Sequence, residues 1–240
     1  MDLSRVALLD IEGTTTPISF VYDVLFPYAR ERLEPFLRAH WDDQETQSEL
    51  LQLREENVRD VAQGAPSLND PAASPVFQRT VAYLDWLIDR DRKSTPLKSL
   101  QGRIWQAGFA AGELKSQVFP DVPAAFANWR KQGRKIGIYS SASVLAQQQL
   151  FEHVAGVGDL SGLISYWFDT RVGGKRDSAS YKRIAVELKE RPDDLLFISD
   201  VTAELDAARQ AGLNTRLALR PGNTEQPASD HETIKSFDEV

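Results

Sequence analysis

The stretch RVALLDIEGTTTP, residues 5–17, places a short apolar run directly before two carboxylates, a glycine and three threonines. Val6 to Leu9 are β-branched or leucine-rich and end at a turn signal, which predicts a fully buried strand. Asp10 and Glu12 then lie at the carboxyl end of that strand, where open α/β sheets bind their ligands. An acidic loop tip in solvent has the same pattern, so this stretch alone does not distinguish a site from a surface.

From Lys135 onward, apolar runs alternate with helical patterns. The expected strands are KIGIYSS, SYWFDTRV, LLFISD and TRLALR, and the expected helices cover residues 144–154, 178–190 and 203–211. This alternation is typical of a parallel sheet with helices on both faces. The predicted fold class is therefore α/β, with a Rossmann-like parallel sheet as its core.

Residues 16–115 show helical patterns and no strand pattern. Two sets of apolar residues have helical spacing: Val81, Leu84, Leu87 and Ile88, and then Leu97, Leu100, Ile104 and Trp105. The stretch AQGAPSLNDPAASP, residues 62–75, is typical of a loop. We therefore predict a mainly α-helical cap, residues 16–115, inserted into a core of residues 1–15 and 116–240. Trp86 and Trp105 are expected in the helix core rather than against a substrate.

Composition narrows the classes of partner. The 240 residues contain no cysteine, which excludes a disulfide framework and a cysteine nucleophile. The formal net charge of -7 argues against nucleic acid or an acidic membrane surface as the main partner. The chain has no apolar run long enough to cross a membrane and no signal-peptide pattern at its N-terminus. We expect a cytoplasmic monomer.

Polar residues also follow the other predicted strands. Ser140 and Ser141 end KIGIYSS just before a helix, where backbone N–H groups favour an anion, although serine is also an ordinary N-cap. Lys175 lies in the turn after SYWFDTRV. Asp200 ends LLFISD, with Glu204 about one helical turn later. Each residue alone has a structural explanation, but four consecutive strands with such ends together favour one site.

These strand ends resemble the four motifs of the haloacid dehalogenase superfamily of phosphohydrolases. Within it, the blocks DIEGTTTPISFVYDVLFPYA, DRKSTPLKSLQGRIWQAGF, IYSSASVLAQQQLF, FDTRVGGKRDSASY and SDVTAELDAA resemble the enolase-phosphatase family of methionine salvage. The resemblance implies a bifunctional, magnesium-dependent enzyme. Such an enzyme enolises 2,3-diketo-5-methylthiopentyl 1-phosphate and then removes the phosphate, which leaves the acireductone.

The resemblance also implies roles for the acidic residues. Asp10 would be the nucleophile, forming an aspartyl-phosphate, and also a ligand of Mg²⁺ together with Asp200. Glu12 would give its backbone carbonyl to the metal and its side chain as general acid and then base. Most phosphatases of the superfamily have Asp where this chain has Glu12. That difference agrees with the enolase-phosphatase pattern and leaves open how Glu12 divides its two roles.

The remaining residues of the resemblance contact the substrate. Ser140, Ser141 and Lys175 would hold the phosphoryl oxygens, with Lys175 supplying charge during transfer. Glu204 is expected to orient Lys175 or a metal-bound water.

Enolisation needs a base and a cation or donor over the forming enolate. The candidates are Arg92, Lys93 and Lys98 in DRKSTPLKSLQG, with Lys98 first because this block most separates the chain from generic relatives. Three alternatives stay open: another cap-bearing phosphatase, a phosphomutase, and a non-catalytic phosphate-binding module. The intact set of Asp10, Glu12, Lys175 and Asp200 weighs against the last.

Overall fold

The computed structural model describes residues 4–70, 75–90 and 92–240. The chain forms two compact units, Met1–Asp23 with Gly112–Val240, and Val24–Ala111, called here the α/β unit and the helical unit. The loop predicted for residues 62–75 falls partly outside the described residues. In the part of the chain that is described, no helix is both long and apolar enough to span a bilayer.

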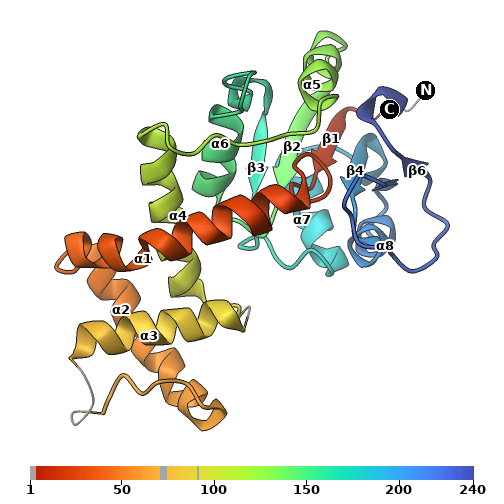
Figure 1. The fold of residues 1–240 in the computed structure, drawn as a ribbon. Coiled ribbons are helices and arrows are strands. Elements are labelled where there is room, and N and C mark those ends of the chain that lie inside the picture. The colour runs from red at the N-terminus through yellow and green to blue at the C-terminus, as the bar shows by residue number, and fades with distance from the viewer. Residues whose placement is uncertain (1–3, 71–74, 91) are drawn as a thin grey trace. The chain divides into compact units, whose positions relative to one another are not determined.

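A six-stranded parallel sheet organises the α/β unit, with the order β3-β2-β1-β4-β5-β6 (Figure 1). The strands are β1 (Val6–Leu9), β2 (Lys135–Tyr139), β3 (Tyr166–Phe168), β4 (Leu195–Ser199), β5 (Asn214–Ala218) and β6 (Thr233–Ile234). The strand that opens the chain pairs with both β2 and β4, so it is an inner strand of the sheet. The predicted α/β class with a Rossmann-like core is confirmed.

Helices cover both faces of the sheet: α5 (Val122–Lys131), α6 (Val144–Glu152), α7 (Ser178–Leu188) and α8 (Thr202–Gln210). Helices α7 and α8 pack on the face that carries Val6, Leu8 and Phe197. Helices α5 and α6 contact β2 and β3 and meet through Phe126 and Phe151 on the other face. Because both faces are covered, all four residues of β1 are fully buried, which explains the unbroken apolar run.

Two strands differ most from the sequence predictions. The predicted strand SYWFDTRV is reduced to the three residues of β3. Asp169 ends it by forming a turn, because its carboxylate accepts from Arg171 N at 2.9 Å and its carbonyl accepts from Val172 N at 3.1 Å. The short strand β6 was not predicted, since two residues are too few for a periodic signal.

The helical unit consists of α1 (Phe26–His40), α2 (Gln44–Asp60), α3 (Val76–Asp89) and α4 (Thr95–Ala110), with a short 3₁₀ turn at Val61–Gln63. It has its own apolar core, which includes Leu37, Leu53 and Tyr83. Trp86 is buried in this core and Trp105 packs against it, as predicted. No described residue between 16 and 115 belongs to a strand of the sheet.

Two buried carboxylates connect the helices of this unit. Glu49 accepts from Ser99 Oγ at 2.5 Å and from Arg103 Nη1 at 3.1 Å. Asp60 accepts from Tyr83 Oη at 2.8 Å and from Arg92 Nη2 at 2.5 Å. Burial raises the pKa of Glu49, although Ser99 and Arg103 oppose that shift. Each carboxylate therefore has an arginine and a neutral donor on another part of the same unit.

Candidate active site

The loop after β1 is a tight turn that fixes Asp10. Asp10 N donates to Ile198 O at 3.0 Å, which extends the pairing with β4. The three threonine N–H groups of residues 14–16 all donate to Ile11 O, at 2.9 to 3.2 Å. Gly13 has a φ of 69°, a left-handed value that suits glycine. The residues EGTTT therefore close a turn that leaves the Asp10 carboxylate, only 4% exposed, at the end of the strand.

Lys175 pairs with two of the predicted acidic residues. Its Nζ lies 2.6 Å from Asp10 Oδ1 and 2.7 Å from Glu204 Oε2, so the contact expected between Glu204 and Lys175 is present. Ser199 Oγ lies 3.2 Å from Asp10 Oδ2 and 3.1 Å from Glu204 Oε2. Since a hydroxyl has one proton, Ser199 donates to one of these carboxylates at a time. Three parts of the chain that are far apart in sequence, at residues 10, 175 and 199–204, thus meet at one point.

Hydroxyl groups hold the turn that carries Lys175. Three consecutive carbonyls of the turn each accept one hydroxyl: Gly173 O from Tyr139 Oη at 2.8 Å, Gly174 O from Ser180 Oγ at 2.9 Å and Lys175 O from Tyr181 Oη at 2.7 Å. The turn is therefore fixed from β2 and α7 together. This restricts the long lysine side chain to one approach towards Asp10.

The charges of this cluster depend on one another. Burial alone would lower the pKa of Lys175, but the adjacent Asp10 and Glu204 carboxylates outweigh burial and raise it. Burial raises the pKa of Glu204, and the negative charge of Asp10 adds to that shift. Lys175 is therefore a permanent cation at neutral pH, suited to hold an anion rather than to act as a base.

Asp200, directly after β4, lies beside the Asp10 loop without a partner of its own. Its carboxylate receives no ion pair or hydrogen bond from another described residue, and a methyl group built on Gly13 would overlap it. Burial, together with the charge of Asp10, raises the pKa of Asp200 to about 7. A bound cation would offset both effects, because its positive charge favours the ionised carboxylate. The carboxylates that lie here, Asp10 and Asp200, are hard oxygen donors of the kind that Mg²⁺ prefers.

No group of three or more histidine or acidic side chains in the described residues is arranged as a metal site. Such a group is not required for Mg²⁺, which commonly keeps several waters and uses one or two carboxylates. The two carboxylates of Asp10 and Asp200 therefore fit a magnesium ion that keeps several waters. They are too few for a cation whose ligands all come from the protein.

Ser140 and Ser141 follow β2, as predicted. Neither caps α6, because Ser143 is the N-cap and its Oγ accepts from Ala146 N at 3.3 Å. Ser140 is buried and its Oγ accepts from Ala142 N at 3.2 Å, whereas Ser141 is exposed. The N-cap role considered for Ser140 and Ser141 therefore belongs to Ser143.

The three candidates for enolisation lie in the helical unit. Lys98 is exposed in the first turn of α4, and its N–H donates to Ser94 O at 3.1 Å. Lys93 is also exposed. Arg92 is committed to the buried Asp60, so its guanidinium already has a structural role. The structure thus distinguishes Arg92 from the two lysines.

Sequence analysis missed two residues next to the site, Ser199 and Asn223. Ser199 is the last residue of a buried strand, and its link between Asp10 and Glu204 depends on a partner 189 residues away. Asn223 Nδ2 donates to Gly13 O at 2.9 Å from the turn after β5. In the sequence, the adjacent Asp200 was a weak signal for Ser199, and the turn residues PGN were a weak signal for Asn223.

Comparison with known proteins covers nearly the whole chain. A family model described as haloacid dehalogenase-like hydrolase matches residues 5–212. "Enolase-phosphatase E1" of Synechococcus elongatus is 52% identical over 233 residues, which cover 97% of this chain and 96% of that protein. The protein of the same name from Drosophila erecta is 46% identical, covering 98% and 92%. The crystal structure of UTR4 protein from Saccharomyces cerevisiae superposes with a TM-score of 0.77 at 31% identity, covering 99% and 100%.

Proposed function

Because the chain belongs to the enolase-phosphatase family of haloacid dehalogenase-like hydrolases, we propose that its reaction takes place where β1, β2 and β4 end. The enzyme converts 2,3-diketo-5-methylthiopentyl 1-phosphate to the acireductone and phosphate, in methionine salvage. The observation that carries the proposed site is the contact of Lys175 with Asp10 at 2.6 Å and with Glu204 at 2.7 Å.

Asp10 is the nucleophile of the phosphatase step. Its carboxylate attacks phosphorus and forms an aspartyl-phosphate while the enolate oxygen of the substrate leaves. Glu12 protonates that oxygen and then takes a proton from the water that hydrolyses the intermediate. Asp10, Asp200 and the Glu12 carbonyl would hold Mg²⁺, which would supply positive charge to offset the charge of the phosphoryl group. The 3% exposure of Asp10 limits the water that competes with the substrate.

Ser140, Ser141 and Lys175 bind the phosphoryl oxygens. Lys175 adds a fixed positive charge where negative charge gathers during transfer. Glu204 and Ser199 keep this lysine and the Asp10 carboxylate oriented, so neither has to reorganise when the substrate binds. The phosphatase step therefore uses residues of the α/β unit alone.

The helical unit acts as a cap, with the core taken as residues 1–15 and 116–240 and the cap as residues 16–115. Lys98 of the cap serves the enolase step, as a cation near the enolate oxygen or as a base if it loses its water. We further propose that the enzyme is a cytoplasmic monomer, acts on a small phosphorylated diketone and has no nucleic-acid or membrane partner.

The test is an assay of the purified chain on the diketo-phosphate, with enol absorbance and phosphate release followed separately. We expect the enol to form first and phosphate to follow, both in the presence of Mg²⁺. Phosphate release without a preceding enol would contradict the bifunctional reaction. If neither enol formation nor phosphate release is observed, the assignment of the site is contradicted.

A further inference from the structure

Asn223, in the turn after β5, has a side-chain oxygen that no described residue satisfies. Its Oδ1 is buried and has no hydrogen-bond partner. Buried polar atoms in native structures are rarely left in this state, because they lose their hydrogen bonds to water without replacement. The missing donor is therefore expected to be a ligand or a water that accompanies one.

The orientation of the Asn223 amide is fixed by its nitrogen. Nδ2 donates to Gly13 O at 2.9 Å and to Ala218 O at 3.1 Å. Both acceptors are carbonyls, which cannot donate, so the nitrogen must face them and Oδ1 must face the other way. A methyl group built on Gly13 would lie 2.9 Å from Asn223 Oδ1 and would overlap Asp200. The amide oxygen and the Asp200 carboxylate therefore flank the same point.

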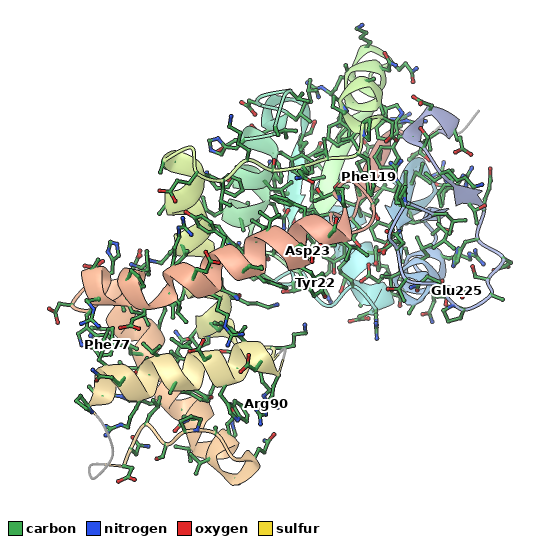
Figure 2. The ribbon with its side chains drawn as sticks, in the orientation of Figure 1. Tyr22, Asp23, Phe77, Arg90, Phe119 and Glu225 are labelled. Atoms are coloured by element: carbon green, nitrogen blue, oxygen red, sulfur yellow. The ribbon has the colours of Figure 1, made fainter. Side chains whose placement is uncertain are left out.

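Arg220 anchors the turn that carries Asn223. Its guanidinium is buried, pairs with Asp121 at 2.8 Å and donates to Thr14 O at 3.2 Å. The ring of Phe119, labelled in Figure 2, lies 4.7 Å from the guanidinium carbon. Asn223 N donates to Arg220 O at 3.2 Å. Asn223 is thus fixed against the loop after β1 by contacts within the α/β unit.

We propose that Asn223 is a positioning residue of the cation site: its Oδ1 accepts a hydrogen bond from a water bound to the divalent cation of Asp10 and Asp200. The inference rests on the proposed function, which supplies the cation. Mg²⁺ keeps several waters in protein sites, and each of them is a strong donor. The same amide also fixes the Gly13 carbonyl, one residue from the proposed ligand carbonyl of Glu12.

The test measures Mn²⁺ binding to the full chain from the electron paramagnetic resonance signal of free Mn²⁺. Asn223→Ala should bind Mn²⁺ about tenfold more weakly, the lower end of the effect found for residues that support metal ligands. Asn223→Asp also loses both N–H donors but keeps acceptor oxygens at the same place. It should recover most of the affinity that the alanine variant loses.

Two variants control for charge and for removal of an amide. Gln226→Glu adds the charge of the aspartate variant three residues along the turn and retains the oxygen that accepts from Thr202 N. Asn214→Ala removes an amide at the opposite end of β5, where Nδ2 donates to Asp193 O at 2.8 Å. Both should bind Mn²⁺ like the unmodified chain.

The outcomes separate this inference from the proposed function. If the unmodified chain binds Mn²⁺ and Asn223→Ala binds it equally well, the inference is wrong while the proposed function stands. The same holds if Asn223→Asp binds Mn²⁺ no better than Asn223→Ala does. It also holds if the gain in affinity of Asn223→Asp over Asn223→Ala is no larger than the gain of Gln226→Glu over the unmodified chain. If the unmodified chain binds no Mn²⁺, both fail. Metal-free melting curves identify a purely structural role, which would lower the melting temperature of both variants and leave Mn²⁺ affinity unchanged.

Discussion

The helical unit and the candidate active site both bury carboxylates, but they compensate the charge differently. In the helical unit, Glu49 and Asp60 each have one arginine and one neutral donor. In the α/β unit, the three carboxylates of Asp10, Asp200 and Glu204 have one described cationic partner, Lys175. Complete pairing connects the helices and leaves no uncompensated carboxylate charge that a ligand could neutralise. We propose that incomplete pairing marks a cation site, and the following experiments test that distinction.

The largest effect is expected from Asp10→Asn. Without the attacking carboxylate, phosphate release should fall by about four orders of magnitude or more, as for other catalytic nucleophiles. The melting temperature should change little, because Lys175 keeps its contact with Glu204. Phosphate release is measured in steady state, with Glu49→Gln in the helical unit as the control that should lose stability instead. Residual activity of more than a few per cent would rule out Asp10 as the nucleophile.

Removal of the cation should have the next largest effect. EDTA should abolish phosphatase activity and Mg²⁺ should restore it, whereas Ca²⁺ should inhibit through its larger and looser coordination shell. Mg²⁺ should also raise the melting temperature of the unmodified chain but not of Asp200→Asn, since a ligand stabilises only the state that binds it. Full activity after exhaustive chelation would show that Asp10 and Asp200 do not form a cation site.

Lys98→Ala should have a smaller and selective effect. Formation of the enol from the diketo-phosphate should slow by about a hundredfold or more, a typical loss for one acid–base or charge-stabilising group. Hydrolysis of a simple aryl phosphate should change far less, because it needs no enolisation. Lys131→Ala, at an exposed lysine of α5, serves as the control. A parallel fall of both activities, or no change in either, would remove Lys98 from the enolase step and leave Arg92 and Lys93 to be tested.

The smallest effect on activity is expected from Arg103→Met in the helical unit. It leaves the buried Glu49 with Ser99 alone and should cost about 2 kcal/mol of unfolding free energy. Its kcat for an aryl phosphate should stay within about twofold, because a structural pair makes no contact with reacting atoms. Arg38→Ala, which breaks an exposed pair with Glu34, should cost less than about 0.5 kcal/mol by the same denaturation assay. If the two variants lost the same unfolding free energy, burial would not determine how much an ion pair stabilises this protein.

Strand identity and order of alternation were predictable because a covered parallel strand is apolar along its whole length. That property identified β1, β2, β4 and β5. It identified β3 but not its end, because the Asp169 carboxylate accepts a hydrogen bond from Arg171 N, a local contact that an apolar pattern does not show. It failed at β6, which pairs with β5 over two residues only.

The acidic and serine residues at the strand ends could be grouped from sequence because parallel strands end at one edge of a sheet. Their distances could not, since Lys175 reaches Asp10 across 165 positions of the chain only after the turn is held by Tyr139 and Tyr181. Ser199 and Asn223 escaped notice for the same reason. Their partners are defined by the packed structure and leave no spacing in the sequence.

The position of β1 also has a consequence for biosynthesis. Ribosomes release the chain from its N-terminal side, so Val6–Leu9 emerges well before its neighbouring strands, which begin at Lys135 and Leu195. The helical unit between them is one continuous segment, Val24–Ala111, which contains all of its own core. Local contacts form quickly and distant parallel pairings form slowly, so the helical unit is expected to fold during translation while β1 remains unpaired. An apolar strand exposed for most of synthesis is a natural substrate for a nascent-chain chaperone.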